Sequence, residues 1–187
     1  MHNPRLAGRY AKSLLDIADE QNQLDPVLAD MKLLQQLCRQ NRDFEMLLRS
    51  PIVKPDKKQS ILEAILGSRI SQLSSAFMKL LVSKGREANL PEIATAFIAA
   101  YKEQKRIKTL HITAAAPMND EVKKAILRKV AESMPGFELE MEESVNPDLI
   151  GGYVLELDSK MVDASIRRDL NDVRKQFSEN LFIHNIR

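Results

Sequence analysis

A segment near the C-terminal end holds the side chains of this chain that are best suited to catalysis. LIGGYVLELDSKMVDAS, residues 149–165, contains two adjacent glycines, the carboxylates Asp158 and Asp163, and Ser165. Adjacent glycines can hold a phosphate with backbone N–H groups, and paired carboxylates can act as general acid and general base. The same residues can also build a strand, a turn and a helix cap, so their context decides between the two interpretations.

That context favours the structural interpretation. Gly151 and Gly152 lead into a strand, whereas a phosphate loop leads into a helix, and neither GxxxxGK[ST] nor GxGxxG occurs in the chain. Asp158 stands in a predicted hairpin turn, where aspartate is favoured. Asp163 lies two residues before Ser165, which we predict to be the N-cap of the final helix. We therefore predict no catalytic residue.

Cysteine and histidine usage predicts no structural metal site. Cys38 is the only cysteine, and it lies among leucines on a helical pattern, where a small buried role is expected. The histidines His2, His111 and His184 are dispersed, without the spacing of metal ligands.

The charge pattern gives little support to nucleic-acid binding. The net charge is +2; residues 1–105 contain 16 Lys+Arg and 12 Asp+Glu, which gives +4, and the remainder contains 12 and 14, which gives −2. Neither part has the dense basic stripe that phosphate contacts require. Aromatic residues make up 5% of the chain and tryptophan is absent, so platforms for base stacking are not expected. No apolar run reaches the length of roughly 18–20 residues that spans a bilayer.

The first 105 residues have the apolar periodicity of consecutive helices. Pro55 suits the first turn of one of them, and Gly67 and Gly85 are stop signals. The connections are short, which predicts a compact bundle of six helices. The predicted helices cover residues 5–21, 27–40, 44–48, 56–66, 70–85 and 89–106.

The period changes at residue 107. Alternating segments that begin at Ile107 and Phe137 predict two strands separated by a helix, and a hairpin and a final helix follow. This order describes a small α/β unit. The predicted fold class is thus mainly α, with a six-helix bundle over residues 1–105 and a small α/β domain over 106–187.

Two helices of the first part are more apolar than a bundle helix needs to be. Phe77, Met78, Leu80, Leu81 and Val82 surround most of one helix, and the first helix has two adjacent apolar stripes. An ordinary bundle helix buries one stripe. Either both helices are central in the bundle, or a groove between them receives an amphipathic helix of a partner, and the pattern alone leaves both open.

With these residues in view, the chain resembles the delta subunit of F-type ATP synthase, the family of the mitochondrial oligomycin-sensitivity-conferring protein. The resemblance runs along essentially the whole chain. It is carried in order by RLAGRYAKSLLDIA, SPIVKPDKKQSIL, FMKLLVSKGREANLPEI and LIGGYVLELDSKMVDASIRRDL. The last of these looks like the family signature, with Ala164 standing where the signature often has glycine.

The resemblance implies a non-catalytic stator subunit that links the catalytic alpha/beta head to the peripheral stalk and resists the torque of the rotor. In the family, the N-terminal domain binds the N-terminal helix of an alpha subunit between its first and fifth helices, and the C-terminal domain joins the b subunits. By position, the expected alpha-subunit contacts are Tyr10, Ser13, Leu14, Ile17, Phe77, Leu80 and Leu81. The signature residues, expected to be mainly structural, are Gly151, Gly152, Asp163, Ser165 and Arg167.

The resemblance further implies one copy per complex rather than a homo-oligomer, held peripherally at the cytoplasmic face of the bacterial inner membrane. It implies no cofactor and no nucleic acid.

Two other hypotheses compete with it. One is a helical nucleic-acid-binding adaptor that uses the +4 charge of residues 1–105, and the other is an enzyme that uses Asp158 and Asp163.

Overall fold

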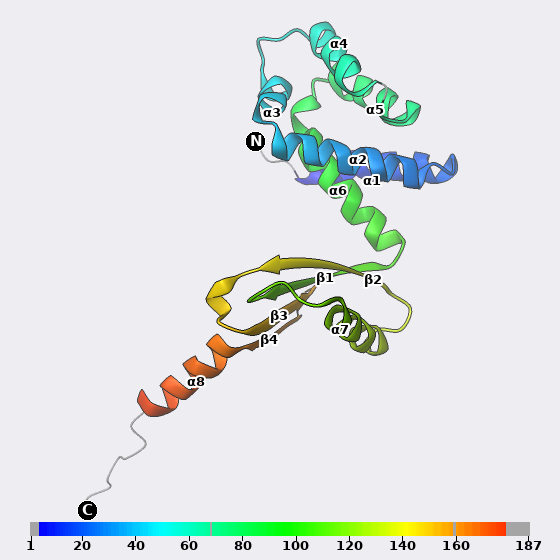
Figure 1. Ribbon diagram of the computed structural model, residues 1–187. Helices are drawn as coiled ribbons and strands as arrows, with labels where there is room; N and C mark the ends of the chain where they lie inside the picture. Colours follow the sequence, from blue (N-terminus) through cyan, green and yellow to red (C-terminus); the bar gives the residue numbers. More distant parts are fainter. Residues whose placement is uncertain (1–3, 68, 159, 179–187) are drawn as a thin grey trace, which may run out of the picture. The chain divides into compact units, whose positions relative to one another are not determined.

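The chain folds as two compact units, Met1–Gln104 and Lys105–Arg187, here named the helical unit and the α/β unit. The computed structural model describes residues 4–67, 69–158 and 160–178 (Figure 1). The first unit is a bundle of six helices and the second combines helices with a small sheet, so the predicted fold class is confirmed. None of the described helices has the length and apolar character to cross a bilayer.

The helical unit begins and ends its helices at residues with clear local reasons. The Asn41 side chain accepts hydrogen bonds from the N–H groups at positions 43 and 44, at 3.1 and 3.2 Å, and the Ser71 hydroxyl accepts one from position 74 at 3.2 Å. Pro55 opens its helix, where its missing N–H costs nothing. The elements are α1 (Pro4–Glu20), α2 (Leu24–Gln40), α3 (Arg42–Arg49), α4 (Pro55–Leu66), α5 (Gln72–Ser83), a 3₁₀ turn η1 (Glu87–Asn89) and α6 (Leu90–Gln104).

Helix α6 is the central element of the helical unit. It packs along both α1 and α2. Its Ile93, Ala94 and Phe97 are fully buried, as are Leu14 and Ala18 of α1. Burying a large apolar side chain contributes roughly 1.5–3 kcal/mol, so this three-helix core supplies much of the stability of the unit.

Buried polar contacts join the outer helices to their neighbours and to α2. The Lys58 ammonium of α4 is buried and donates to the Leu48 carbonyl oxygen at 3.0 Å and to Glu87 Oε1 at 2.6 Å. The Asp30 carboxylate of α2 accepts from the Ser71 N–H at 2.9 Å. Because a buried charge is costly unless it is paired, these contacts hold α4 and the start of α5 in one position.

The α/β unit is a four-stranded sheet in the order β2-β1-β3-β4. Strands β1 and β2 are parallel and joined through α7, while β1 pairs with β3 and β3 with β4 in antiparallel fashion. The elements are β1 (Ile107–Ala114), α7 (Asp120–Ser133), β2 (Glu138–Val145), a 3₁₀ turn η2 (Pro147–Leu149), β3 (Gly152–Leu157), β4 (Lys160–Ser165) and α8 (Ile166–Ser178).

Helix α7 covers one face of this sheet (Figure 1). Leu110 and Ile112 of β1 are buried beneath Ile126 of α7, and their cross-strand neighbours Leu157 and Leu155 pack around them. The alternation in β1 thus places its apolar face as the sequence predicts. Helix α8 contributes no buried side chain among its described residues, and Figure 1 shows it leading away from the sheet.

Candidate functional site

The flanks of α1 and α5 that face each other meet through two aromatic rings. Tyr10 and Phe77 pack edge to face, with ring centroids 6.4 Å apart and an interplanar angle of 66°. Ser13 and Ile17 follow Tyr10 at helical spacing, and Leu80 lies three residues after Phe77, so each shares a flank with one of the two rings. The surface formed by Tyr10, Ser13 and Ile17 of α1 with Phe77 and Leu80 of α5 is named the α1–α5 flank.

The seven residues expected to contact an alpha subunit divide by exposure. Leu14 and Leu81 are each 1% exposed and Phe77 is 8% exposed, so these side chains belong to the core. Ile17 is 42% and Leu80 46% exposed. Tyr10 is half-buried, and Ser13 is exposed with its hydroxyl donating to the Arg9 carbonyl at 3.0 Å. The surface that a partner can reach is therefore formed by Tyr10, Ser13, Ile17 and Leu80.

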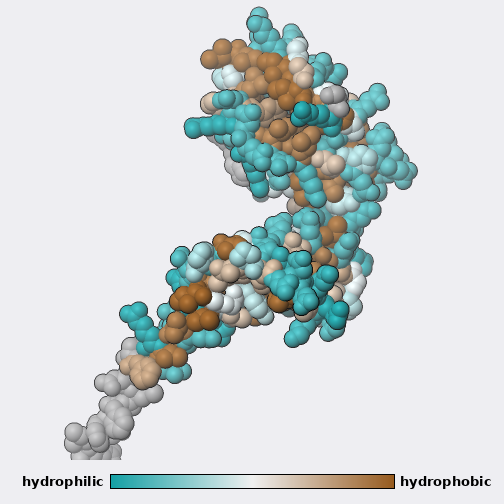
Figure 2. Space-filling model, viewed as in Figure 1, coloured by the Kyte–Doolittle hydropathy of each residue, from teal (hydrophilic) through white to brown (hydrophobic). Residues whose placement is uncertain are grey.

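A second unpartnered surface runs along α8. Every fourth or third residue from the start of this helix is apolar and exposed: Ile166 (46%), Leu170 (53%), Val173 (47%) and Phe177 (86%). This set is named the α8 stripe. Figure 2 shows these hydrophobic residues in brown along α8, between hydrophilic neighbours. A helix of this length with no buried side chain is only marginally stable alone in water, so the stripe has the character of an interface.

The two signature glycines are required by close backbone packing. Gly152 has φ +75°, and a Cβ on it would lie 2.1 Å from the Ala164 carbonyl oxygen on β4. A Cβ on Gly151 would lie 2.5 Å from Ile166 Cδ1. The pair thus lets β3 begin against the junction of β4 and α8, and it forms no anion-binding loop.

Ser165 caps α8, as the sequence predicts. Its hydroxyl accepts from the Arg168 N–H at 3.2 Å, and its own N–H donates to Asp163 Oδ1 at 2.9 Å. The Arg168 guanidinium donates in turn to the Asp163 carbonyl oxygen. Arg167 is exposed, and the side-chain contacts at this place are made by Arg168.

Removing the Ser165 hydroxyl should destabilise the α/β unit. We expect Ser165→Ala to lower the free energy of unfolding by about 1–2 kcal/mol, because the cap is lost in a buried site. Chemical denaturation of the full chain measures this change. Ser133→Ala is the matched control, because the exposed Ser133 hydroxyl bonds only to its own helix. Equal stability of the native chain and Ser165→Ala would contradict the capping role.

The same cluster predicts an acid-sensitive contribution to stability. Hydrogen bonds from Ser165, through its hydroxyl and then its N–H, hold the pKa of Asp163 below its ordinary value of 3.8. A carboxyl whose pKa is lowered by folding stabilises the fold above its unfolded pKa and loses this contribution as the pH falls through the folded pKa. The melting temperatures of the native chain and Asp163→Asn should therefore differ at neutral pH, approach each other as the pH falls below 3.8, and converge below the folded pKa of Asp163. A difference that persists unchanged in acid would contradict this.

The two aspartates do not form an acid–base pair. Asp158 sits in the hairpin turn with φ +53° and pairs with Lys108 at 2.9 Å, while Asp163 lies at the other end of β4. Lys160 pairs with Leu157 beside the turn and Asp163 pairs with Val154, so three strand steps, roughly 10 Å, separate Asp163 from the turn that holds Asp158. Burial raises the pKa of the Cys38 thiol to about 11, so this thiol is neutral and unreactive. Within the described residues, no group of His, Cys, Asp and Glu has the arrangement of a metal site.

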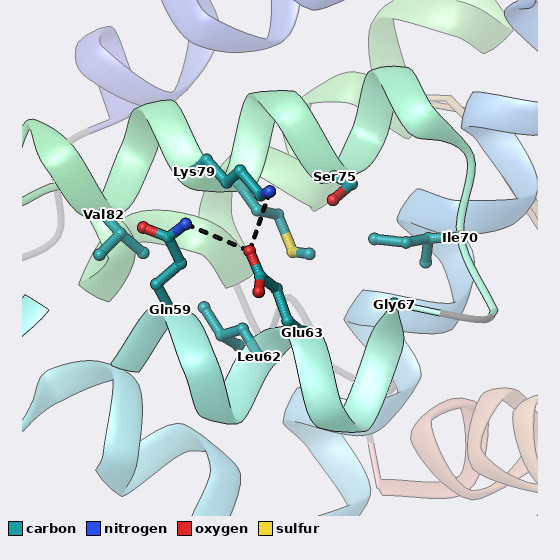
Figure 3. A pocket seen from close by; sticks show the side chains of 9 residues that line it. Gln59, Leu62, Glu63, Gly67, Ile70, Ser75, Lys79 and Val82 are labelled. Atoms are coloured by element: carbon teal, nitrogen blue, oxygen red, sulfur yellow. Dashed lines mark hydrogen bonds and ion pairs between the residues drawn. The ribbon is translucent and has the colours of Figure 1, made fainter. Parts of the chain in front are cut away.

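A crevice between α4 and α5 is too small for a ligand. It encloses a cavity of about 10 Å³, which is space for one water. Figure 3 shows Glu63 on its rim, where the carboxylate pairs with Lys79 at 2.9 Å and accepts from Gln59 at 3.1 Å. The hydrogen bond from Lys79 lowers the pKa of Glu63. The crevice is therefore part of the packing contact between α4 and α5, and it is not a binding site.

The family model described as the ATP synthase delta (OSCP) subunit matches residues 6–177. The chain belongs to this family. It is 34% identical over 184 residues to "ATP synthase subunit delta" of Cytophaga hutchinsonii, an alignment that covers 97% of this chain and 98% of the relative. It is 30% identical over 186 residues to the protein of that name from Christiangramia forsetii, with both chains covered completely.

The fold is that of a solved structure as well. A chain of the Toxoplasma gondii mitochondrial ATP synthase hexamer superposes with a TM-score of 0.71 at 21% identity, covering 94% of this chain and 99% of that chain. At this identity the likeness concerns the fold. It extends over both units of the chain.

Membership in the delta (OSCP) family decides among the competing hypotheses. The chain is a non-catalytic subunit of ATP synthase that links the catalytic head to the stalk, so the prediction that it is not an enzyme is confirmed. Its partners are other subunits of ATP synthase, and it is a peripheral component of that complex. The fold and the relatives give no support to the nucleic-acid-binding alternative.

Some candidate contact residues were not singled out from the sequence. Leu6 and Leu73 are half-buried and lie at helical spacing from Tyr10 and Phe77, respectively. The α8 stripe was expected as part of the final helix of the C-terminal domain, and none of its residues was assigned to the contact with the stalk. Its spacing is visible in the sequence, but an exposed stripe and a buried one have the same spacing.

Proposed function

We propose that the helical unit binds the N-terminal helix of an alpha subunit on the α1–α5 flank. The observation that carries this proposal is the exposure of Ile17 and Leu80 beside the Tyr10–Phe77 ring pair. Apolar side chains on two adjacent helices form the kind of surface that receives the apolar face of a third helix. Leu14, Phe77 and Leu81 act beneath this surface, where they fix the spacing of α1 and α5.

The α/β unit binds the b subunits of the peripheral stalk through the α8 stripe. Four exposed apolar residues at positions i, i+4, i+7 and i+11 form one continuous seam, as in helices that pair with a partner helix. Charged residues such as Arg167 and Asp169 border this seam and keep the unbound helix in water. The signature residues have a structural role, because they fix the point at which α8 leaves the sheet.

Residues 1–105 and 106–187 thus act as two docking domains of one chain. Once one surface is bound, the effective concentration of the second partner at the other surface is higher. This suits a subunit that must stay attached to both partners under torque. One copy acts in each complex and does not pair with another copy. The complex holds it at the cytoplasmic face of the bacterial inner membrane.

A bridging assay with the full chain tests this function. An alpha-subunit N-terminal peptide is immobilised, and a soluble fragment of the b subunits from the same ATP synthase is passed over it. We expect capture of the b fragment only when the full chain is present. Binding of the chain to the peptide with no capture of the b fragment would refute the stalk role, and absence of peptide binding would refute the role of the helical unit.

A further inference from the structure

A pocket rich in arginine opens at one end of the α1–α5 flank. Its volume is 410 Å³, and it is formed by the first turns of α1 and the turn that follows α5. This cationic pocket is lined by Arg5, Leu6, Arg9, Tyr10 and Arg86. Three guanidinium groups and no carboxylate therefore surround one space.

The positive charge of this pocket is uncompensated. Across the described part of the chain, none of Arg5, Arg9 and Arg86 has an ion pair or a side-chain hydrogen bond with another residue. The first turn of α1 contains no acidic residue, so the positive end of the helix dipole adds to the same field. Three like charges that share a cavity repel one another, and an anion between them would stabilise the arrangement.

We propose that the cationic pocket receives an acidic side chain of the helix that docks on the α1–α5 flank. This inference rests on the proposed function and deepens it. Tyr10 lines the pocket and also belongs to the flank, so the pocket adjoins the surface on which the helix docks. The planar guanidinium fork binds a carboxylate through two parallel hydrogen bonds, which selects an acidic side chain at this place.

The geometry sets the register of the docked helix. Arg9 and Ile17 are eight residues apart on α1, which corresponds to roughly 12 Å along the helix axis. A partner helix that runs along α1 therefore carries its acidic residue about two turns from the apolar residue that covers Ile17. The pocket thus determines which way the partner helix lies as well as how tightly it binds.

The test is a titration of the full chain with the alpha-subunit N-terminal peptide at low and at high salt. Arg9→Gln and Arg86→Gln are each expected to weaken binding about 10-fold at low salt, because each removes a charged hydrogen bond. Both should also reduce the dependence of the affinity on salt. Lys12→Gln is the matched control, since it removes one exposed charge from α1 outside the pocket, and it should bind as the native chain does.

The peptide supplies the second half of the test. Each of its acidic residues is replaced in turn by the corresponding amide, and the affinity of each peptide is measured with the native chain and with Arg86→Gln. One replacement should weaken binding to the native chain about 10-fold and have little further effect on Arg86→Gln. Additive effects at every acidic position would overturn the proposal.

Failure of this proposal is distinguishable from failure of the proposed function. Native peptide affinity in both arginine variants overturns the role of the pocket and leaves the flank intact. Absence of peptide binding to the native chain overturns the function of the flank itself.

Inorganic phosphate and a single-stranded oligonucleotide are titrated in parallel. If the arginine substitutions abolish binding of either while peptide binding is unchanged, the pocket holds a phosphate and the proposal is wrong.

Discussion

A chain that carries both Ile17→Glu and Leu80→Glu is expected to bind the alpha-subunit N-terminal peptide at least 100-fold more weakly than the native chain. Both side chains are a little under half exposed, so docking would bury the rest of their apolar surface. Losing that burial and placing a carboxylate in the contact costs roughly 3 kcal/mol or more in total, and each 1.4 kcal/mol is tenfold in affinity. Isothermal titration calorimetry with the full chain measures the loss.

Two comparisons separate lost contact from lost folding. Ile61→Glu with Ile65→Glu is the matched control, because these α4 side chains are 37% and 41% exposed and lie outside the flank. This control should bind the peptide as the native chain does. Leu81→Ala removes a core side chain and should instead lower the free energy of unfolding by about 2–5 kcal/mol. If the α4 variant loses binding and the flank variant keeps it, the docking surface lies on α4.

The sequence predicted the helices well and the exposed faces of two of them poorly. On α1, the periodicity marks Leu14 and Ile17 alike, yet the first is buried against the bundle and the second is exposed. On α5, Leu80 and Leu81 are neighbours in an apolar run, yet Leu80 is 46% exposed and Leu81 is 1% exposed. A helix that is apolar on most sides has no polar face to show which stripe is turned inward, so packing partners decide.

The α/β unit shows the same limit in another form. Turn and cap chemistry is local, and the turn at Asp158 and the cap at Ser165 were therefore predictable from neighbouring residues. Strand β4 extends to Ser165 because it pairs with β3 along its whole length. Lys160 lies opposite Leu157 at one end, and Ser165 lies opposite Gly152 at the other. Such register is a long-range property, and the local pattern that predicts a hairpin does not contain it.

The α8 stripe differs from the α1–α5 flank because the described residues of the α/β unit leave most of it uncovered. In the helical unit, an exposed apolar residue lies beside a core that exists without a partner. Along α8 the described residues contribute no side chain to a core, so its stability as a helix depends on what binds it. The stalk interface proposed on α8 should therefore be more sensitive to a single charge than the flank is.

Leu170→Glu alone is accordingly expected to weaken binding of the b-subunit fragment by about 100-fold, because Leu170 is central in the stripe and a charge there must be desolvated on docking. Surface plasmon resonance with the full chain immobilised through the alpha-subunit peptide measures the affinity. Asn171→Glu introduces the same charge one residue along the helix, away from the stripe, and should bind as the native chain does.

The pair of variants also discriminates between contact and helix formation. Both substitutions place glutamate in α8, and glutamate favours helix about as well as leucine does, so a loss confined to Leu170→Glu comes from the apolar contact. Loss of binding in Asn171→Glu as well would mean that charge anywhere on α8 is disruptive. Native affinity in Leu170→Glu would mean that the stalk contact lies outside the α8 stripe, and that the exposed apolar residues of the stripe do not bind the stalk.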